Sequence, residues 1–107
     1  MKRYVTTLLL AMSFGGIANA AMDNKAAEEM MKRDGCTACH AIDKKVIGPA
    51  YKDVAMKYKD DKDALTRLTA KVKKGGSGVW GQTAMPPNFL VKDDDIKQLV
   101  TWILTLN

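Results

Sequence analysis

The sequence predicts a small all-α protein with a single domain. Apolar residues recur every three to four positions through most of the chain, and no stretch alternates between apolar and polar residues as a half-buried strand would. The chain has 107 residues, and a chain of this size forms one domain with a thin hydrophobic core. Domains this small often need a covalent staple to be stable.

The first twenty residues have the pattern of a secretory signal peptide. Lys2 and Arg3 form a positive start, residues 5–17 are apolar or small, and Ala18-Asn19-Ala20 is a small-residue cleavage site. We therefore expect cleavage of residues 1–20 and a single mature domain over residues 21–107. The alternative is an uncleaved anchor, but the apolar stretch is short for a bilayer. No stable membrane insertion is expected after cleavage.

Two helices are expected in the first half of the mature chain. Asp23 or Asn24 can cap a first helix, and Gly35 suits its end. The apolar face expected for this helix consists of Ala26, Ala27, Met30 and Met31. After a turn at residues 47–49, Tyr51, Val54, Ala55 and Tyr58 have helical spacing.

Two more helices are expected in the second half, separated by a long loop. Asp60, Asp61 and Asp63 would start a helix that ends at Gly75, and its inward residues would be Leu65, Leu68 and Val72. Residues 75–91 have no periodicity, and a long irregular loop in a small domain usually carries function. The last helix opens with Asp93, Asp94 and Asp95, where the helix dipole favours negative charge. Its apolar stripe is Ile96, Leu99, Val100, Ile103 and Leu104.

The most specific motif is the run Cys36-Thr37-Ala38-Cys39-His40, the C-x-x-C-H attachment pattern of c-type haem. The two thiols would form thioether bonds with the haem vinyl groups, and His40 would be the proximal iron ligand. A zinc site would need two more ligands, and the chain has no other Cys or His. A thioredoxin-like redox pair would lie in a βαβ pattern, and none is seen.

The second axial ligand is expected to be Met85. With no second histidine, a methionine is the natural candidate, and the other mature methionines are Met22, Met30, Met31 and Met56. Met22 is at the terminus, and Met30 and Met31 are too close to the C-x-x-C-H motif to reach the opposite haem face. Met56 lies on a predicted helix, where a methionine usually packs in the core. Met85 lies in the long loop, where the two prolines that follow it stiffen the backbone.

With these motifs, the chain closely resembles the small bacterial class I cytochromes c of the c-551/c-552 type. The matching residues are 36–43, 46–55, Gly78-Val79-Trp80-Gly81, Met85-Pro86-Pro87-Asn88 and Trp102-Ile103-Leu104, and the resemblance covers essentially the whole mature chain. It implies the class I cytochrome c fold, with about four helices around one covalently attached haem. It also implies His/Met ligation and an electron-carrier role.

The resemblance also implies supporting roles in haem binding. Pro49 would present its carbonyl to the His40 ring, Asn88 would lie near the Met85 sulfur, and Trp80 and Lys71 would contact the propionates. Other readings stay open at this point. Trp80 could be plain core, Asn88 could be a simple turn residue, and Lys71 lacks the planar two-pronged geometry of arginine.

We therefore expect a periplasmic, monomeric one-electron carrier that meets redox donors and acceptors transiently. A haem edge would be exposed near Cys36, Thr37 and Ala38, and Lys44 and Lys45 could steer an acidic partner. A haem enzyme or a gas sensor would need an open sixth site, which Met85 would block. The formal charge of +5 falls when the two basic residues of the signal peptide are removed, which argues against nucleic acid.

Overall fold

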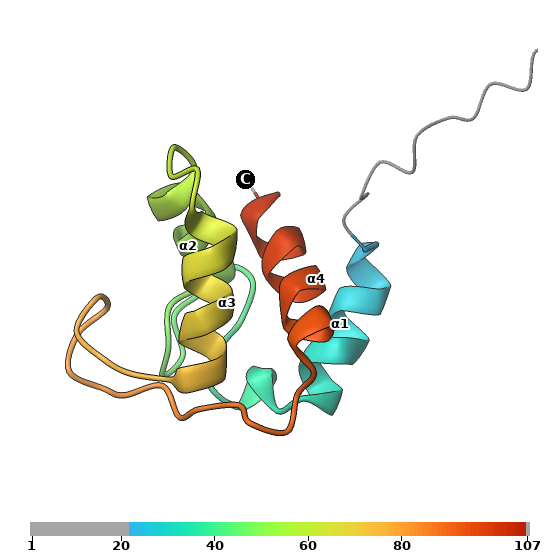
Figure 1. The fold of residues 1–107 in the computed structure, drawn as a ribbon, viewed down its shortest axis with the longest axis horizontal. Helices are drawn as coiled ribbons and strands as arrows, with labels where there is room; N and C mark the ends of the chain where they lie inside the picture. The colour runs from blue at the N-terminus through green and yellow to red at the C-terminus, as the bar shows by residue number, and fades with distance from the viewer. Residues whose placement is uncertain (1–21, 107) are drawn as a thin grey trace, which may run out of the picture.

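The structure is a computed structural model that describes residues 22–106, so the expected signal peptide at residues 1–20 lies outside the described residues. Its elements, in chain order, are α1 (Asn24–Arg33), the short 3-10 helix η1 (Cys36–Ala38), α2 (Tyr51–Tyr58), α3 (Ala64–Lys74) and α4 (Asp93–Leu104) (Figure 1). Residues 22–106 contain isolated β-bridges but no strand, which confirms the all-α prediction. None of the described helices is long and apolar enough to cross a bilayer.

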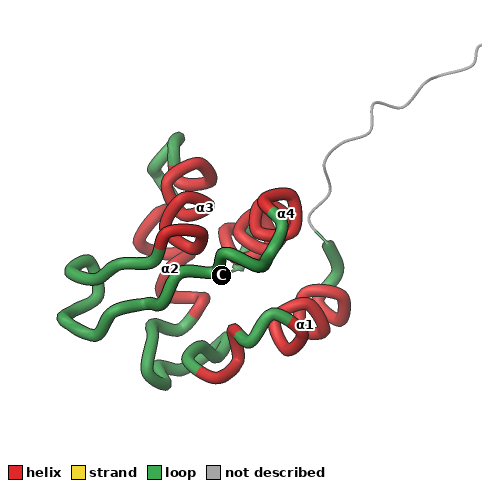
Figure 2. Tube along the Cα trace, turned by 60° about the horizontal axis from the view of Figure 1, so that its bottom comes forward, coloured by secondary structure: helices red, strands yellow, loops and turns green. Residues whose placement is uncertain are grey.

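Helix α4 is the centre of the fold, because α1, α2 and α3 all pack against it (Figures 1 and 2). The three expected aspartates lie in its first turn, where they complement the partial positive charge of the helix N-terminus. Four residues of the predicted apolar stripe are buried, and Trp102 is buried with them. The fifth, Leu104, is only half-buried.

Helix α1 is capped by Asp23 rather than by Asn24. The Asp23 carboxylate accepts a hydrogen bond of 2.8 Å from the backbone N–H of Ala26, which satisfies one of the free donors of the first turn. The side chain of Asn24 instead accepts a bond of 3.0 Å from the Trp102 indole N–H, and so ties α1 to α4. Ala26 is exposed, so the buried face is narrower than expected and centres on Ala27 and Met31.

Helix α3 differs from the prediction in two ways. It begins at Ala64, and the Asp61 carboxylate accepts a hydrogen bond of 2.9 Å from the Asp63 N–H in the turn before it. The prediction that Leu65 faces inward is wrong, because its side chain is 39% exposed. Ala64 takes the buried position of the first turn, and each helical residue is rotated by about 100° from the one before it. Leu65 therefore faces solvent.

Candidate functional site

A cavity of about 620 Å³ lies between α2, α3, α4 and the two loops that carry the predicted ligands. Its wall is mainly apolar, and the buried stripe of α4 forms part of this wall. The aliphatic residues that line it from the helices are Val54, Leu68, Val72, Ile96, Leu99, Val100 and Ile103. A space of this kind suits a large apolar ligand inserted into the core.

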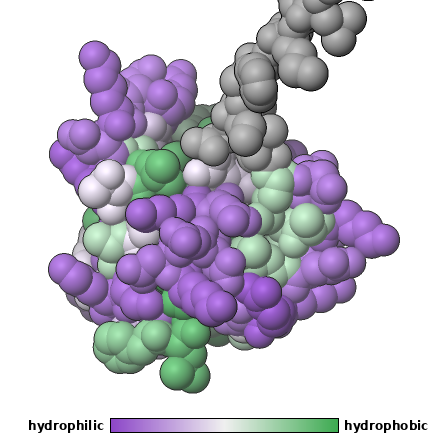
Figure 3. Space-filling view, turned by 45° about the vertical axis from the view of Figure 1, so that its right-hand side comes forward, coloured by the Kyte–Doolittle hydropathy of each residue, from purple (hydrophilic) through white to green (hydrophobic). Residues whose placement is uncertain are grey.

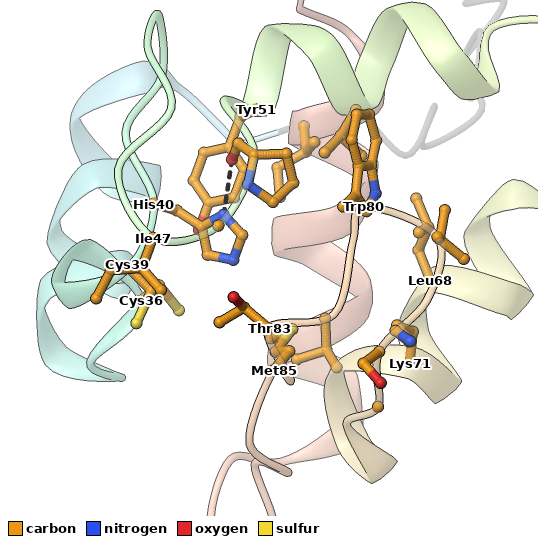
Figure 4. Close-up of a pocket in the computed structure, with 18 of the residues that line it drawn as sticks. Cys36, Cys39, His40, Ile47, Tyr51, Leu68, Lys71, Trp80, Thr83 and Met85 are labelled. Carbon is orange, nitrogen blue, oxygen red and sulfur yellow. Dashed lines mark hydrogen bonds between the residues drawn. The ribbon is translucent and has the colours of Figure 1, made fainter.

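The two cysteines and His40 line one side of the cavity (Figure 4). The turn of η1 brings them together, because the His40 N–H donates a hydrogen bond of 3.0 Å to the Cys36 carbonyl. Both thiols are free and half-buried, and Figure 4 draws their sulfur atoms close together beside His40. Burial raises the pKa of the Cys36 thiol above its ordinary value.

The His40 ring is held in one orientation. Its Nδ1 lies 2.8 Å from the carbonyl oxygen of Pro49, so in the neutral imidazole Nδ1 carries the proton and the lone pair is on Nε2. Figure 4 shows the second ring nitrogen directed into the cavity. Gly48 packs against the ring so closely that a Cβ there would lie 2.5 Å from Cε1. The imidazole is thus positioned to bind a metal through Nε2.

Met85 lies across the cavity from His40, beside Thr83 (Figure 4). Two backbone hydrogen bonds with Gly76 hold it there: the Gly76 N–H donates to the Met85 carbonyl over 3.0 Å, and the Met85 N–H donates to the Gly76 carbonyl over 2.8 Å. Gly75 has a φ of 72°, and a Cβ at that position would collide with the Met85 carbonyl. The close approach of these two backbone segments therefore requires glycine at position 75.

No other methionine of residues 22–106 lines this cavity. Met31 is buried in the core cluster, and Met22 and Met30 pack against that cluster. Met56 is 68% exposed, so the expectation that a methionine on this helix is core is wrong for it. Among the methionines that the structure describes, Met85 alone is placed to reach a group inside the cavity.

Trp80 and Lys71 both line the cavity. The indole of Trp80 is 42% exposed, so the alternative that it is plain core is wrong. The ammonium of Lys57 lies 5.5 Å from the centroid of the Trp80 ring. Lys71 lies against Gly76, where a Cβ would be 2.9 Å from its Nζ.

Asn88 is not among the residues that line the cavity. Its backbone N–H donates a hydrogen bond of 3.1 Å to the Val72 carbonyl, which attaches the end of the loop to α3. It lines a smaller pocket of about 290 Å³ next to Arg33 and Asp34. The structure therefore brings together every predicted site residue except Asn88.

Two cavity residues were missed as site residues from the sequence. Tyr51 stacks on the His40 ring, with centroids 5.0 Å apart and planes 18° apart, and its place just after the Gly48-Pro49 turn was the available signal. Arg67 lines the cavity one helical turn before Lys71, and the i, i+4 spacing of two basic residues could have revealed it. Arg67 also pairs with Asp61 over 3.0 Å.

The donor set fits a c-type haem. The apolar cavity matches a flat apolar ring. Two adjacent thiols line it and could bond to the vinyl groups of that ring, while an oriented imidazole and, opposite it, a thioether could bind the iron from either face. Within residues 22–106, no group of three or more His, Cys, Asp or Glu side chains is placed to hold another metal ion. The fold and the site therefore define a small haem protein of the c type.

The comparisons with known proteins agree. The family model "Cytochrome c" matches residues 24–107, and the chain belongs to this family. It is 54% identical over 82 residues to cytochrome c-552 of Nitrosomonas europaea, which covers 77% of this chain and 80% of that protein. It is 43% identical over 105 residues to cytochrome c-551 of Pseudomonas aeruginosa, which covers 98% of each chain.

The solved structures support the same assignment. The crystal structure of wild-type Nitrosomonas europaea cytochrome c552 superimposes with a TM-score of 0.73 at 54% identity and covers 75% of this chain and 99% of that chain. The fold is thus the class I cytochrome c fold, and the cofactor is one covalently attached haem c. The protein is an electron carrier and not an enzyme.

Proposed function

We propose that the mature protein is a periplasmic carrier of single electrons between respiratory redox partners, with His40 and Met85 as the axial ligands of its haem iron. Cys36 and Cys39 form the thioether bonds in this proposal. The observation that carries it is the position of His40 and Met85 on facing sides of one cavity. When bound, the haem supplies an Fe(II)/Fe(III) couple.

The residues around the two ligands limit movement during electron transfer. Pro49 fixes the orientation of the His40 ring through its carbonyl, and Gly76 binds both backbone polar groups of Met85. A soft thioether ligand favours the reduced iron, and an apolar wall disfavours the extra charge of the oxidised iron. Both effects raise the reduction potential, and rigid ligands keep the reorganisation small. Trp80, Lys71 and Pro49 complete the proposed haem contacts, and Asn88 acts through the backbone of the loop.

Partner docking is proposed at the haem edge next to the thioether side. Thr37 and Ala38 are exposed there. Val46 and Ile47 are also exposed, and Ile47 lines the cavity. Lys44 and Lys45 lie next to this apolar pair, so an acidic partner would be attracted to it. Transient redox complexes use small interfaces of this kind.

The expected signal peptide supports the periplasmic location, where the mature protein would act as a monomer. Mass spectrometry of the haem-loaded protein from the periplasmic fraction would show a polypeptide that begins at Ala21. Recovery of the full-length chain in the membrane fraction would contradict both cleavage and location.

The ligation is tested by optical spectroscopy of the ferric haem protein. We expect the weak far-red charge-transfer band of a sulfur–iron bond in the wild type and in Met56→Ala, and its loss in Met85→Ala. Met56→Ala is the matched control, because Met56 is exposed and outside the cavity. A wild type without the band, or a Met85→Ala protein that keeps it, would show that Met85 is not the ligand.

A further inference from the structure

The loop that carries Met85 is attached to the helices at its base by backbone contacts. Gly75 donates to Lys71 over 2.7 Å, Gly76 and Met85 bond to each other, and Asn88 donates to Val72 over 3.1 Å. The Nζ of Lys73 adds a bond of 2.8 Å to the Val91 carbonyl. Both ends of the loop are therefore held on α3, independently of any contact farther out.

The outer part of the loop, residues 77–84 (the loop tip), is held very differently. Its one backbone hydrogen bond among the described contacts joins Gly78 to Gly81, within the tip itself. Figure 1 shows this part of the loop projecting beyond α2 and α3. Nevertheless, several of its residues line the cavity, among them Val79, Trp80, Thr83 and Ala84. The position of the tip thus decides how well this side of the cavity is closed.

One described side-chain interaction joins the loop tip to a helix. The ammonium of Lys57, in the last turn of α2, lies 5.5 Å from the centre of the Trp80 ring, within the range of a cation–π contact. Figure 4 shows the Trp80 ring extending toward α2, with its indole nitrogen at the end nearer Leu68 and Lys71. The ring face that binds Lys57 is therefore separate from the N–H edge, which stays available to the cavity.

We propose that Lys57 is a positioning residue that holds the loop tip closed over the cavity by binding the face of Trp80. The Gly76–Met85 pair separates the tip from the base, so loss of Lys57 opens the tip while Met85 keeps its backbone position. The proposal rests on the proposed function only in taking this cavity as the haem site. It does not depend on which atom is the sixth ligand.

The test is limited proteolysis of the haem-loaded protein with chymotrypsin, with the first cuts identified by mass spectrometry. Cleavage after Trp80 requires its ring to leave Lys57 and enter the specificity pocket of the protease, and the initial rate follows the population in which the ring is released. Phe89 is an internal reference, because it is 71% exposed and lies outside the tip. The measured quantity is the ratio of the initial cleavage rates after Trp80 and after Phe89.

Three variants distinguish loss of the Lys57–Trp80 contact from a general loss of stability. Lys57→Met keeps the long side chain without its charge, and we expect the ratio to rise roughly two- to fivefold, as loss of an exposed cation–π contact predicts. Lys57→Arg keeps a cation and should retain the wild-type ratio. Lys59→Met is the matched control, because Lys59 is exposed and makes no ion pair or cation–π contact among the described residues.

An unchanged ratio in Lys57→Met, or an equal rise in Lys59→Met, would overturn the proposal. A rise of both cleavage rates together would also overturn it, because it would mean that Lys57 only stabilises the whole fold. The far-red band is recorded on the same samples. If the wild type lacks it, the proposed ligation fails while the cleavage ratio still decides the role of Lys57.

Discussion

The phenol ring of Tyr51 is stacked on the imidazole of His40, with ring centroids 5.0 Å apart and planes 18° apart. Tyr51 in turn meets Trp102 edge-on at 6.4 Å, and the Trp102 indole N–H donates to Asn24. A continuous row of contacts therefore runs from the proposed iron ligand on one loop through α2 and α4 to α1. The orientation of His40 depends on the packing of three helices.

Truncation of Tyr51 should destabilise the protein strongly. Tyr51→Ala removes a buried ring that contacts both His40 and Trp102, and the expected loss is about 3–5 kcal/mol in the free energy of unfolding. Tyr51→Phe keeps the ring and should cost far less. Guanidinium unfolding of the ferric haem protein measures both. Similar losses in the two variants would mean that the hydroxyl, and not the ring, is what matters.

The same residue predicts a loss of stability at alkaline pH. Burial raises the pKa of Tyr51 above its ordinary value near 10, so above that pH the unfolded chain releases a proton that the folded chain retains. Tyr51 therefore leaves the stability unchanged below about pH 10 and lowers the free energy of unfolding progressively as the pH rises above it. Tyr51→Phe should lack this decline. Parallel curves of stability against pH for the two proteins would contradict the prediction.

A methyl group at Gly48 should disturb the His40 ring. A Cβ there would lie 2.5–3.0 Å from three ring atoms, so Gly48→Ala must push the ring away from Pro49 or move the backbone. We expect a loss of about 1–3 kcal/mol and a change in the visible spectrum of the ferric haem. Gly78→Ala is a useful comparison, because a Cβ at Gly78 meets nothing within 4 Å. Its positive φ of 107° adds strain, but it should leave the spectrum unchanged.

Removal of the Asn24 side chain should weaken the link between α1 and α4. Trp102 is buried, and its N–H donates to Asn24 over 3.0 Å, so Asn24→Ala leaves a buried donor without its protein partner. The expected cost is about 1–2 kcal/mol of unfolding free energy. The adjacent Lys25→Ala should change stability by less than about 0.5 kcal/mol. If both variants lost the same amount, helix propensity rather than the indole bond would be responsible.

Prevention of haem attachment should leave the chain poorly folded. The cavity of about 620 Å³ lies against the apolar stripe of α4, and an apolar group must fill it for the helices to pack on one another. We expect the Cys36→Ala/Cys39→Ala double variant, prepared without haem, to lose most of its helical circular dichroism. A native-like spectrum of that variant would show that the four helices fold without the cofactor.

The helices and the haem-attachment motif could be predicted because each has a local signature. The periodicity of residues 96–103, a cap at Asp23 or Asn24, and the C-x-x-C-H motif at residues 36–40 all depend on a few neighbouring positions. The start of α3 was less clear, because three aspartates in a row of polar residues give several possible first turns. Hydrophobicity alone does not distinguish Leu65 from Ala64, so the sequence pattern wrongly predicts that Leu65 faces inward.

The contacts around the site could not be predicted, because they join segments that are far apart in the chain. Periodicity placed Tyr51 on the buried side of α2, but gave no sign that it would lie on His40. Lys57 had the pattern of an ordinary solvated residue near a helix end, and only the return of the long loop places Trp80 beneath it. The position of Asn88 outside the cavity likewise depends on its bond to α3.

The paired hydrogen bonds between Gly76 and Met85 have a consequence for how this protein can change over evolution. They close the chain on itself just before the methionine, so that residues 77–84 form a separate unit inserted between two fixed points. Apart from Trp80, such an insert can vary in sequence and length, as loop tips generally do, while the backbone of Met85 stays in place. The rest of the tip can thus change without moving the residue that we propose as the second iron ligand.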